Sequence, residues 1–336
     1  MRLATYNVEW FNSLFEDDGA LIRDGSWSAR YNVTKQMQAD ALGHVFRAID
    51  ADAVMVIEAP DQSPHRSTVA ALENFAQIYG LRAREALIGF TNDTQQEIAL
   101  LYDPDAMSAR HDPRADGLIP RFDLTMPRDL DVDDAPETIA FSKPPLEVSL
   151  QTKRGNSLRL IGVHAKSKAP HGAKSSNEAK RISIENRRKQ LAQCIWLRKR
   201  VEADLAKGDA LVVLGDLNDG PGLDEFEELF GRSGVEIVLG HDGAPEQQLY
   251  DPHVELGLRR RLAATPVTAR FFNRDTKQWL SVLLDYIMVS PGLKALNGLW
   301  RIWHPFDDIQ CYADPEMREA LLTASDHFPV SWDVDL

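Results

Sequence analysis

The chain has few cysteines, and it lacks long apolar runs and internal repeats. Cys194 and Cys311 have no neighbours at metal-ligand spacing, and two cysteines do not make the disulfide framework of a small secreted protein. Apolar stretches such as Ala210 to Leu214 are too short for a membrane helix. Met1-Arg2 leads directly into a strand-like segment, without room for a signal peptide. We therefore expect a cytoplasmic protein that does not act at a membrane.

Positive charge is also scarce. The chain has 38 Lys and Arg against 51 Asp and Glu, a formal net charge of −13. Proteins that hold duplex nucleic acid tightly are usually basic, because affinity comes from phosphate contacts that release counterions. The charge argues against a stable nucleic-acid complex but not against transient binding and hydrolysis of DNA or RNA, since a metal ion supplies local positive charge. The sequence predicts no stable protein partner.

The rest of the composition is typical of a folded protein with a sizeable core. Hydrophobic residues make up 43% and charged residues 26% of the 336 residues. This length would allow two domains, but the motifs described next lie at both ends of the chain and have to meet. We expect residues 1–336 to form a single domain.

Polar residues follow several short apolar runs. Asn7, Glu58, Asp216 and Asp285 each come directly after such a run, or within one residue of it. Short apolar runs bounded by polar residues are typical of buried strands, and ligands in α/β folds gather beyond strand ends. Ser325-Asp326-His327 adds a histidine near the C-terminus. We expect these side chains to meet at one rim of a sheet.

The chemistry of this set indicates a hard metal ion. Amide and carboxylate oxygens suit Mg²⁺ or Mn²⁺, whereas Zn²⁺ prefers cysteine and histidine. Magnesium usually takes one or two carboxylates together with substrate phosphate oxygens. Each motif alone also has a structural explanation: residues 216–222 fit a strand-ending turn, and Ser325-Asp326 a helix cap. Several strand-end carboxylates in one chain favour a phosphate-processing site over these alternatives.

At this point the chain resembles the endonuclease/exonuclease/phosphatase family of metal-dependent phosphoesterases. The resemblance covers nearly the whole chain, in family order. The matching stretches are Leu3 to Glu9, Asp52 to Glu58, Ile161 to His164, Leu214 to Asn218, Leu284 to Ser290 and Ser325 to His327.

The resemblance implies a metal site. Asn7 and Glu58 would hold Mg²⁺, for which Mn²⁺ may stand in, and Asp326 would complete the shell. Glu9 would be an outer group of the same metal, because some repair nucleases have an acidic residue two positions after the asparagine. The alternative for Glu9 is an exposed glutamate at a strand end.

The resemblance also implies catalytic roles. Asp216 would orient or deprotonate the attacking water, and Asn218 would bind a phosphate oxygen. His327, oriented by Asp285, would stabilise or protonate the transition state. His164 would be a second donor to the phosphate.

A basic segment follows His164. Lys166, Lys168 and Arg187 stand out in so acidic a chain, and Lys166 in particular is predicted to bind substrate phosphate. The alternative is a solvated loop and helix start. The run from His164 to Lys168 is similar to one in bacterial nucleases of the family.

The apolar spacing predicts the main elements of the fold. Helices are expected over Lys35 to Ile49, Ser67 to Tyr79, Asn177 to Leu205 and Asp224 to Phe230. Ala86 to Phe90 and Ile98 to Tyr102 are expected to pair as strands, and Pro145 to Leu150 to form a hairpin with Leu158 to His164. Asp103 to Pro145 and Leu239 to Ala269 are expected to be long irregular connections. The expected fold is α/β, a four-layer α-β-β-α sandwich of two mixed sheets flanked by helices.

Three functions remain in competition. The first is a Mg²⁺-dependent phosphodiester hydrolase, a nuclease. The second is a phosphomonoesterase or a lipid phosphodiesterase with the same site; the lipid enzyme would need an exposed apolar hairpin, of which the sequence gives no clear sign. The third is a binding protein that has lost catalysis, which the joint presence of all the site residues opposes.

Overall fold

Two large mixed sheets form the centre of the computed structural model, which describes all residues except 118, 129–136, 171, 222–230, 260–264 and 274–276. The six-stranded sheet has the order β14 (Leu299–Ile302), β15 (Val330–Asp333), β1 (Arg2–Asn7), β2 (Ala53–Ala59), β4 (Glu97–Tyr102) and β3 (Glu85–Ile88). The five-stranded sheet has the order β13 (Asp285–Val289), β10 (Leu211–Asp216), β9 (Ser157–His164), β8 (Leu146–Thr152) and β5 (Met107–His111).

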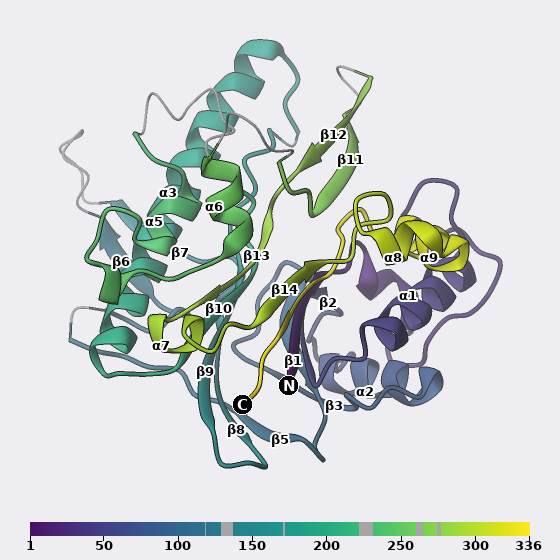
Figure 1. The fold of residues 1–336 in the computed structure, drawn as a ribbon. Helices are drawn as coiled ribbons and strands as arrows, with labels where there is room; N and C mark the ends of the chain where they lie inside the picture. Colours follow the sequence, from purple (N-terminus) through teal and green to yellow (C-terminus); the bar gives the residue numbers. More distant parts are fainter. Residues whose placement is uncertain (118, 129–136, 171, 222–230, 260–264, 274–276) are drawn as a thin grey trace.

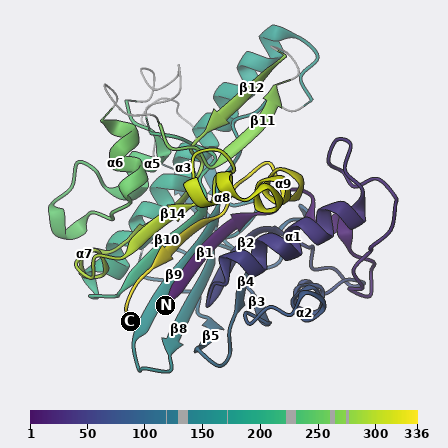
Figure 2. The ribbon, with the colours of Figure 1, turned by 45° about the vertical axis from the view of Figure 1, so that its right-hand side comes forward.

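Helices cover the outer faces of both sheets (Figures 1 and 2). The six-stranded sheet carries α1 (Lys35–Ile49), α2 (Thr68–Tyr79), α8 (Ile309–Ala313) and α9 (Pro315–Ala324). The five-stranded sheet carries α3 (Ser176–Ala206), α5 (Gly234–Leu239) and α6 (Pro252–Leu258). Shorter elements are α7 (Pro291–Lys294), η1 (Phe11–Leu14), η2 (Pro245–Gln247) and two hairpins, β6 (Thr125–Arg128) with β7 (Glu137–Ala140) and β11 (Ala269–Asn273) with β12 (Gln278–Val282). The predicted α-β-β-α sandwich is confirmed.

Alternation along the strands divides the core into three layers. In β1, Leu3 packs between the two sheets, whereas Ala4 and Tyr6 pack under the helices of the six-stranded sheet. In β9, Leu160 faces the other sheet and Ile161 faces α3. Both faces of each sheet are therefore buried, and its strand ends are the places where polar side chains can gather.

Strand direction decides where those ends lie. β1 runs parallel to β2, and β9 runs parallel to β10, so the carboxyl ends within each pair lie together. β15 is antiparallel to β1, and β13 is antiparallel to β10. The chain therefore enters β15 and β13 at the rim where the parallel strands end.

Most elements begin and end as the apolar spacing predicts. The helix over Lys35–Ile49 has the predicted bounds and is capped by Thr34, whose side chain accepts from the Met37 amide. Ser67 is the N-cap of α2 and not its first residue. The predicted pairing of β3 with β4 and the β8–β9 hairpin are also present. The predicted helix over Asp224 to Phe230 lies outside the described residues.

Three predictions about connections were wrong. The apolar run before Asp285 is not a strand that ends there: β12 ends at Val282, and Asp285 is the first residue of β13. In their described parts, the region from 239 to 269 contains α6, and the region from 103 to 145 contains β5, β6 and β7. Both regions carry many polar and turn residues, which hid short elements that long-range pairing stabilises. In the described part of the chain, no helix is both long enough and apolar enough to cross a bilayer.

Candidate active site

The predicted site residues meet at one rim of the sandwich. Asn7, His164 and Asp216 are the last residues of β1, β9 and β10, and Asp285 is the first of β13. Asp216 lies directly opposite His164 in one neighbouring strand and opposite Asp285 in the other. The structure thus brings together residues up to several hundred positions apart.

Asp216 is a fully buried carboxylate of this rim and is held by amide groups. Its Oδ1 accepts from the backbone amide of Asn218 at 2.6 Å, and its Oδ2 accepts from Nδ2 of Asn218 at 2.9 Å and Nδ2 of Asn7 at 3.1 Å. Burial, followed by the negative charge of Asp285, raises the pKa of Asp216 to about 7. A carboxylate with a fixed orientation and a pKa near neutrality suits a general base.

The backbone of the rim adopts uncommon conformations. Glu58 has φ 61°, Asn218 has φ 50° and Trp10 has φ 58°, in the left-handed region that side chains other than glycine seldom occupy. Glu58 sits where the register of β2 shifts between Ile57 and Ala59, so this bulge turns its side chain toward the rim. Strained positions of this kind persist where the surrounding structure holds them, and they gather at functional sites.

Gly215, just before Asp216, has no room for a side chain. Its φ is 131°, and a Cβ there would lie 2.1 Å from the backbone oxygen of Val163 in the neighbouring strand. Glycine is therefore required to bring β10 close to β9 at the point where Asp216 and His164 emerge.

Oxygen atoms on the other side of the rim fit a hard cation. Because Nδ2 of Asn7 donates to Asp216, its Oδ1 faces the other way, and among the described residues this buried oxygen has no hydrogen-bond partner. Burial, and the nearby charge of Asp326, raise the pKa of Glu58, although Lys143 and His327 oppose the shift. Two repelling carboxylates beside an unpaired amide oxygen form the donor set that Mg²⁺ accepts. No group of three or more His, Cys, Asp or Glu side chains suited to a metal occurs in the described residues, so a cysteine or histidine metal centre is not supported there.

His327 and Asp285 form a buried pair. Nδ1 of His327 lies 2.7 Å from Oδ2 of Asp285, and Oγ1 of Thr268 accepts from the Asp285 amide at 2.9 Å. Burial disfavours the charged ring, but the carboxylate of Asp285 prevails and raises the pKa of His327 well above its ordinary value. This shift favours the protonated ring, and Nε2 of His327 lies 4.0 Å from Oδ1 of Asp326.

Comparisons with known proteins agree with this geometry. Residues 4–327 match the model of the endonuclease/exonuclease/phosphatase family. The chain belongs to that family. Its members are phosphoester hydrolases that generally use divalent metal ions, and the chain is an enzyme of this kind.

Solved structures of the same fold are distant in sequence. A 3'-5' exonuclease (NExo) from Neisseria meningitidis is 16% identical with a TM-score of 0.51, and the match covers 100% of both chains. Truncated TDP2 from Caenorhabditis elegans is 14% identical with a TM-score of 0.52, covering 100% of this chain and 97% of that one. A 3' phosphatase NExo from Neisseria, bound to a product DNA hairpin, is 16% identical with a TM-score of 0.50, and the match covers 100% of both chains. No curated protein matches the sequence.

Lys143 is a residue of this rim that the sequence did not reveal. Its Nζ lies 3.2 Å from Nδ1 of His164, and its charge acts on Glu58 and Asp216. Burial lowers the pKa of Lys143, and the two carboxylates oppose this change. Lys143 precedes β8 in the segment predicted to be an irregular loop, 21 positions from His164. No local pattern marks it, because only the return of the chain to β8 brings it to the rim.

Lys143 also acts on the charge of His164. Burial, and then the charge of Lys143, lower the pKa of His164 well below its ordinary value, which favours the neutral ring. Nζ of Lys143 lies 3.2 Å from Nδ1 and 3.5 Å from Nε2 of this ring, so the ammonium group can donate to either nitrogen. Nε2 lies 3.6 Å from Oδ2 of Asp216 and 3.9 Å from Oε1 of Glu58, so the ring lies against the centre of the site.

Two predicted residues are held by protein groups. Asn218 was predicted to bind phosphate, but its Nδ2 donates to Asp216 and, at 3.1 Å, to the backbone oxygen of Ala165. Both hydrogens of the amide are used, so Asn218 positions Asp216. The carboxylate of Glu9 forms an ion pair with Arg30 and accepts from the Trp10 indole at 3.0 Å. Glu9 thus lies beside the site with both oxygens engaged, and its role as an outer group of the metal stays a prediction.

The basic residues that follow His164 have different surroundings. Lys168 and the fully buried Arg187 pair with Asp219, at 2.8 and 2.7 Å, and so tie the loop after β10 to α3. Lys166 is different, because its charge lowers the pKa of both His164 and Lys143, which places its charge near these two residues of the rim.

Ser325 connects the end of β1 to the segment that carries His327. Its Oγ donates to the backbone oxygen of Asn7 at 2.8 Å and accepts from the amides of Glu9 at 3.1 Å and His327 at 3.2 Å. The sequence motif contains this serine, but only the contacts show why a hydroxyl is needed there.

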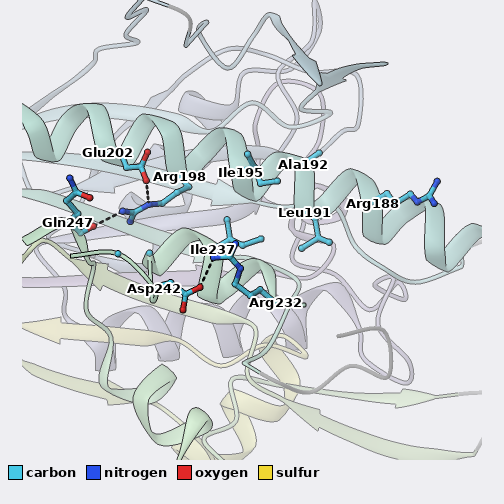
Figure 3. A pocket seen from close by; sticks show the side chains of 12 residues that line it. Arg188, Leu191, Ala192, Ile195, Arg198, Glu202, Arg232, Ile237, Asp242 and Gln247 are labelled. Carbon is cyan, nitrogen blue, oxygen red and sulfur yellow. Dashed lines mark hydrogen bonds and ion pairs between the residues drawn. The ribbon is translucent and has the colours of Figure 1, made fainter. Parts of the chain in front are cut away.

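A separate hollow lies between α3 and α5 (Figure 3). Its side chains are mutually satisfied: Arg198 pairs with Glu202 and donates to the backbone oxygen of Gln247, and Arg232 pairs with Asp242. None of the rim residues lines it, so it is not the active site of this family member.

Proposed function

We propose that the protein is a Mg²⁺-dependent phosphodiester hydrolase that acts on nucleic acid. The observation that carries this proposal is the meeting, at one rim, of Asp216 with a pKa near 7, an imidazolium and an oxygen set that needs a cation. Each of these three parts has one task in hydrolysis by water.

Asn7, Glu58 and Asp326 would hold the metal ion. Bound there, it would supply positive charge that polarises a phosphoryl oxygen and stabilises the leaving oxyanion. The fit rests on the buried Oδ1 of Asn7 and on the mutual repulsion of the carboxylates, which a cation would relieve.

Asp216 would act on the attacking water. Its deprotonated carboxylate takes a proton as the water oxygen bonds to phosphorus and the bond from phosphorus to the leaving ester oxygen breaks. Asn7 and Asn218 hold the carboxylate by their amide hydrogens, which fixes its direction without protonating it. Their contribution to catalysis is orientation.

Negative charge that develops on the phosphoryl oxygens would be stabilised by two histidines and two lysines, which are His327, His164, Lys143 and Lys166. His327 donates from Nε2 while Asp285 holds the opposite nitrogen. The neutral His164 ring beside Lys143 would donate from its one N–H. Donors fixed before the reaction need no rearrangement as charge develops, and this is where electrostatic catalysis gains most.

The charge balance favours a diester over a monoester. Two metal ligands, Asp216 and Asp285 are carboxylates, and together they balance Mg²⁺, Lys143 and the imidazolium of His327. A diester would then add one unmatched negative charge, which Lys166 is placed to offset, whereas a monoester would add two. Descriptions of the structural neighbours as an exonuclease and as a phosphatase bound to DNA support nucleic acid as the source of the phosphate. We also propose a cytoplasmic location, since Cys194 and Cys311 are buried free thiols.

A substrate panel tests the proposal. Purified protein is incubated with Mg²⁺ or Mn²⁺ and with bis-p-nitrophenyl phosphate, p-nitrophenyl phosphate, DNA and RNA oligonucleotides, and sphingomyelin. We expect kcat/KM to be higher for the diester than for the monoester, and oligonucleotides to be cleaved. Asp216→Asn, which preserves shape but removes the base, serves as the inactive control. A clear preference for p-nitrophenyl phosphate or sphingomyelin would contradict the proposal and assign the enzyme to the second group of functions.

A further inference from the structure

The β11–β12 hairpin exposes large apolar side chains. Phe272 is 47% exposed, Trp279 60% and Leu280 38%. The hairpin projects from the sandwich beside α8 in both views (Figures 1 and 2). No clear apolar hairpin was predicted from the sequence, whereas the structure exposes one here. Rings this exposed lower the solubility of a protein unless they have a binding role.

The first residues of the hairpin contact the backbone of the catalytic rim directly. Ala269, its first residue, forms a backbone bridge with His327, and the amide of Arg270 donates to the backbone oxygen of Asp326 at 2.7 Å. Thr268, just before it, holds Asp285. Phe272 is three residues further along the strand, a rise of about 10 Å from Ala269. That is the length of about three stacked nucleotides of one strand, at about 3.4 Å each.

The aromatic rings form one surface with an arginine among them. Phe272 and Trp279 are opposite each other in the register, with ring centroids 5.6 Å apart. The guanidinium of Arg270 lies over Trp279 at 4.9 Å and over Phe306 at 5.4 Å. Phe306 is 42% exposed, and its amide donates to Nδ1 of His304 at 3.2 Å. We call Arg270, Phe272, Trp279 and Phe306 the aromatic platform.

We propose that the aromatic platform stacks the unpaired bases of a single-stranded nucleic acid whose phosphate lies in the catalytic rim. Aromatic and guanidinium planes stack on bases of any sequence, because every base has a π face. This inference rests on the proposed function, since it assumes that the diester belongs to a polynucleotide.

The net charge of the protein makes such a surface necessary. At −13, the chain gains little from counterion release, which supplies most of the affinity of basic nucleic-acid binders. Stacking does not depend on phosphate charge and provides affinity that an acidic protein otherwise lacks. Arg270 favours a base over a lipid tail as the occupant, because its guanidinium lies between the rings and would lose its hydration in a hydrocarbon layer.

The test compares an oligonucleotide with a small diester in the same enzyme. Phe272→Ala, Trp279→Ala and the double variant are assayed with Mg²⁺ on single-stranded DNA, on a blunt duplex and on bis-p-nitrophenyl phosphate. We expect the ratio of kcat/KM for single-stranded DNA to that for the small diester to fall about 10-fold for each ring, mostly through KM. Trp279→Phe, which keeps a ring, should restore most of the ratio. Leu299→Ala, at an exposed apolar position of edge strand β14, is the matched control and should leave the ratio unchanged.

Other outcomes separate the two proposals. An unchanged ratio in the double variant would overturn the aromatic platform but would leave the proposed phosphodiesterase activity intact. The same conclusion would follow if the wild-type protein hydrolysed bis-p-nitrophenyl phosphate but neither cleaved nor bound the oligonucleotide. Wild-type protein that hydrolyses neither would contradict the proposed function itself. Sedimentation with phosphatidylcholine vesicles that both ring variants abolish, with the ratio unchanged, would show that the hairpin meets a membrane and would also overturn the platform.

Discussion

The two sheets contribute unlike halves to the catalytic rim. From the six-stranded sheet come Asn7 and Glu58, near the charge of Asp326, and the buried Oδ1 of Asn7 has no hydrogen-bond partner among the described residues. From the five-stranded sheet come His164, Asp216 and Asp285, and each of these side chains contacts another polar group of the rim. One half is incomplete without a cation, and the other is organised before any ligand arrives.

This difference shows how the work of the site is divided. Repelling carboxylates keep the first half electrostatically strained, so metal binding should stabilise it. The second half already holds its base, Asp216, and through Asp285 it holds the proton donor His327, which comes from the segment before β15. Removing the cation should therefore abolish activity with a change in stability, whereas changes in the second half should alter the rate with little effect on metal binding.

The largest effect is expected from removing the cation from the first half, which Asn7 and Glu58 form. Chelation should abolish turnover, and Mg²⁺ or Mn²⁺ should restore it. Independently of activity, Mg²⁺ should raise the melting temperature of the wild type, because a ligand that binds only the folded state stabilises it. This rise should disappear in Glu58→Gln and persist in Glu9→Gln, whose parent carboxylate is paired with Arg30. Full activity in excess chelator would contradict the division of the site.

Breaking the His327–Asp285 pair should have the next largest effect. We expect His327→Ala to lower kcat by on the order of 10² to 10⁴, the cost of losing a positioned donor. Asp285→Asn should act through the same step, since it releases Nδ1 of the ring. In the double variant the two losses should be far from additive in free energy. Simple additivity, with Mg²⁺-dependent stabilisation retained, would show that the residues act separately.

Lys143 offers a smaller and more specific test of the second half. Lys143→Met keeps the apolar length and removes the charge, and kcat/KM should fall about 10- to 100-fold, the value of one hydrogen bond to a charged group. Lys143→Arg should retain most of the activity. Lys189→Met, at an exposed lysine of α3 paired with Glu185, is the matched control. If Lys143→Met is as active as the wild type, Lys143 does not contact the phosphate.

The pH dependence should be the mildest effect. Since Asp216 has a raised pKa of about 7, its deprotonated fraction falls with falling pH, and kcat should drop about tenfold from pH 8 to pH 6. The same shift means that the folded protein binds this proton more tightly than the unfolded chain, so the associated stability is present below about pH 4 and lost as the pH rises to about 7. A cation in the first half lowers this pKa, and the limb of the pH profile should move to lower pH as Mg²⁺ increases. If the pH at which kcat falls does not change with the Mg²⁺ concentration, the two halves of the site are independent.

Local pattern predicted most elements and the chemistry of the site. The spacing of apolar residues placed α1 with its exact bounds, because an amphipathic helix of 15 residues repeats its signal several times. It failed between 278 and 289, where one apolar run is divided into β12 and β13. A short apolar run contains no local pattern that marks a break between two strands. The pairing of β13 with β10 determines where β13 begins.

By itself, the sequence determined which kinds of side chain end the strands, and so the preference for a hard cation and a histidine supported by a carboxylate. Only the tertiary structure decided which partner each side chain has. It placed Lys143 on His164, turned the amide of Asn218 to Asp216, engaged Glu9 with Arg30, and exposed the rings of β11 and β12 beside the rim. The physical reason is that residue type and local spacing are properties of a segment. Contacts across the rim depend on strand order, register and loop return, which are fixed only when the two sheets pack together.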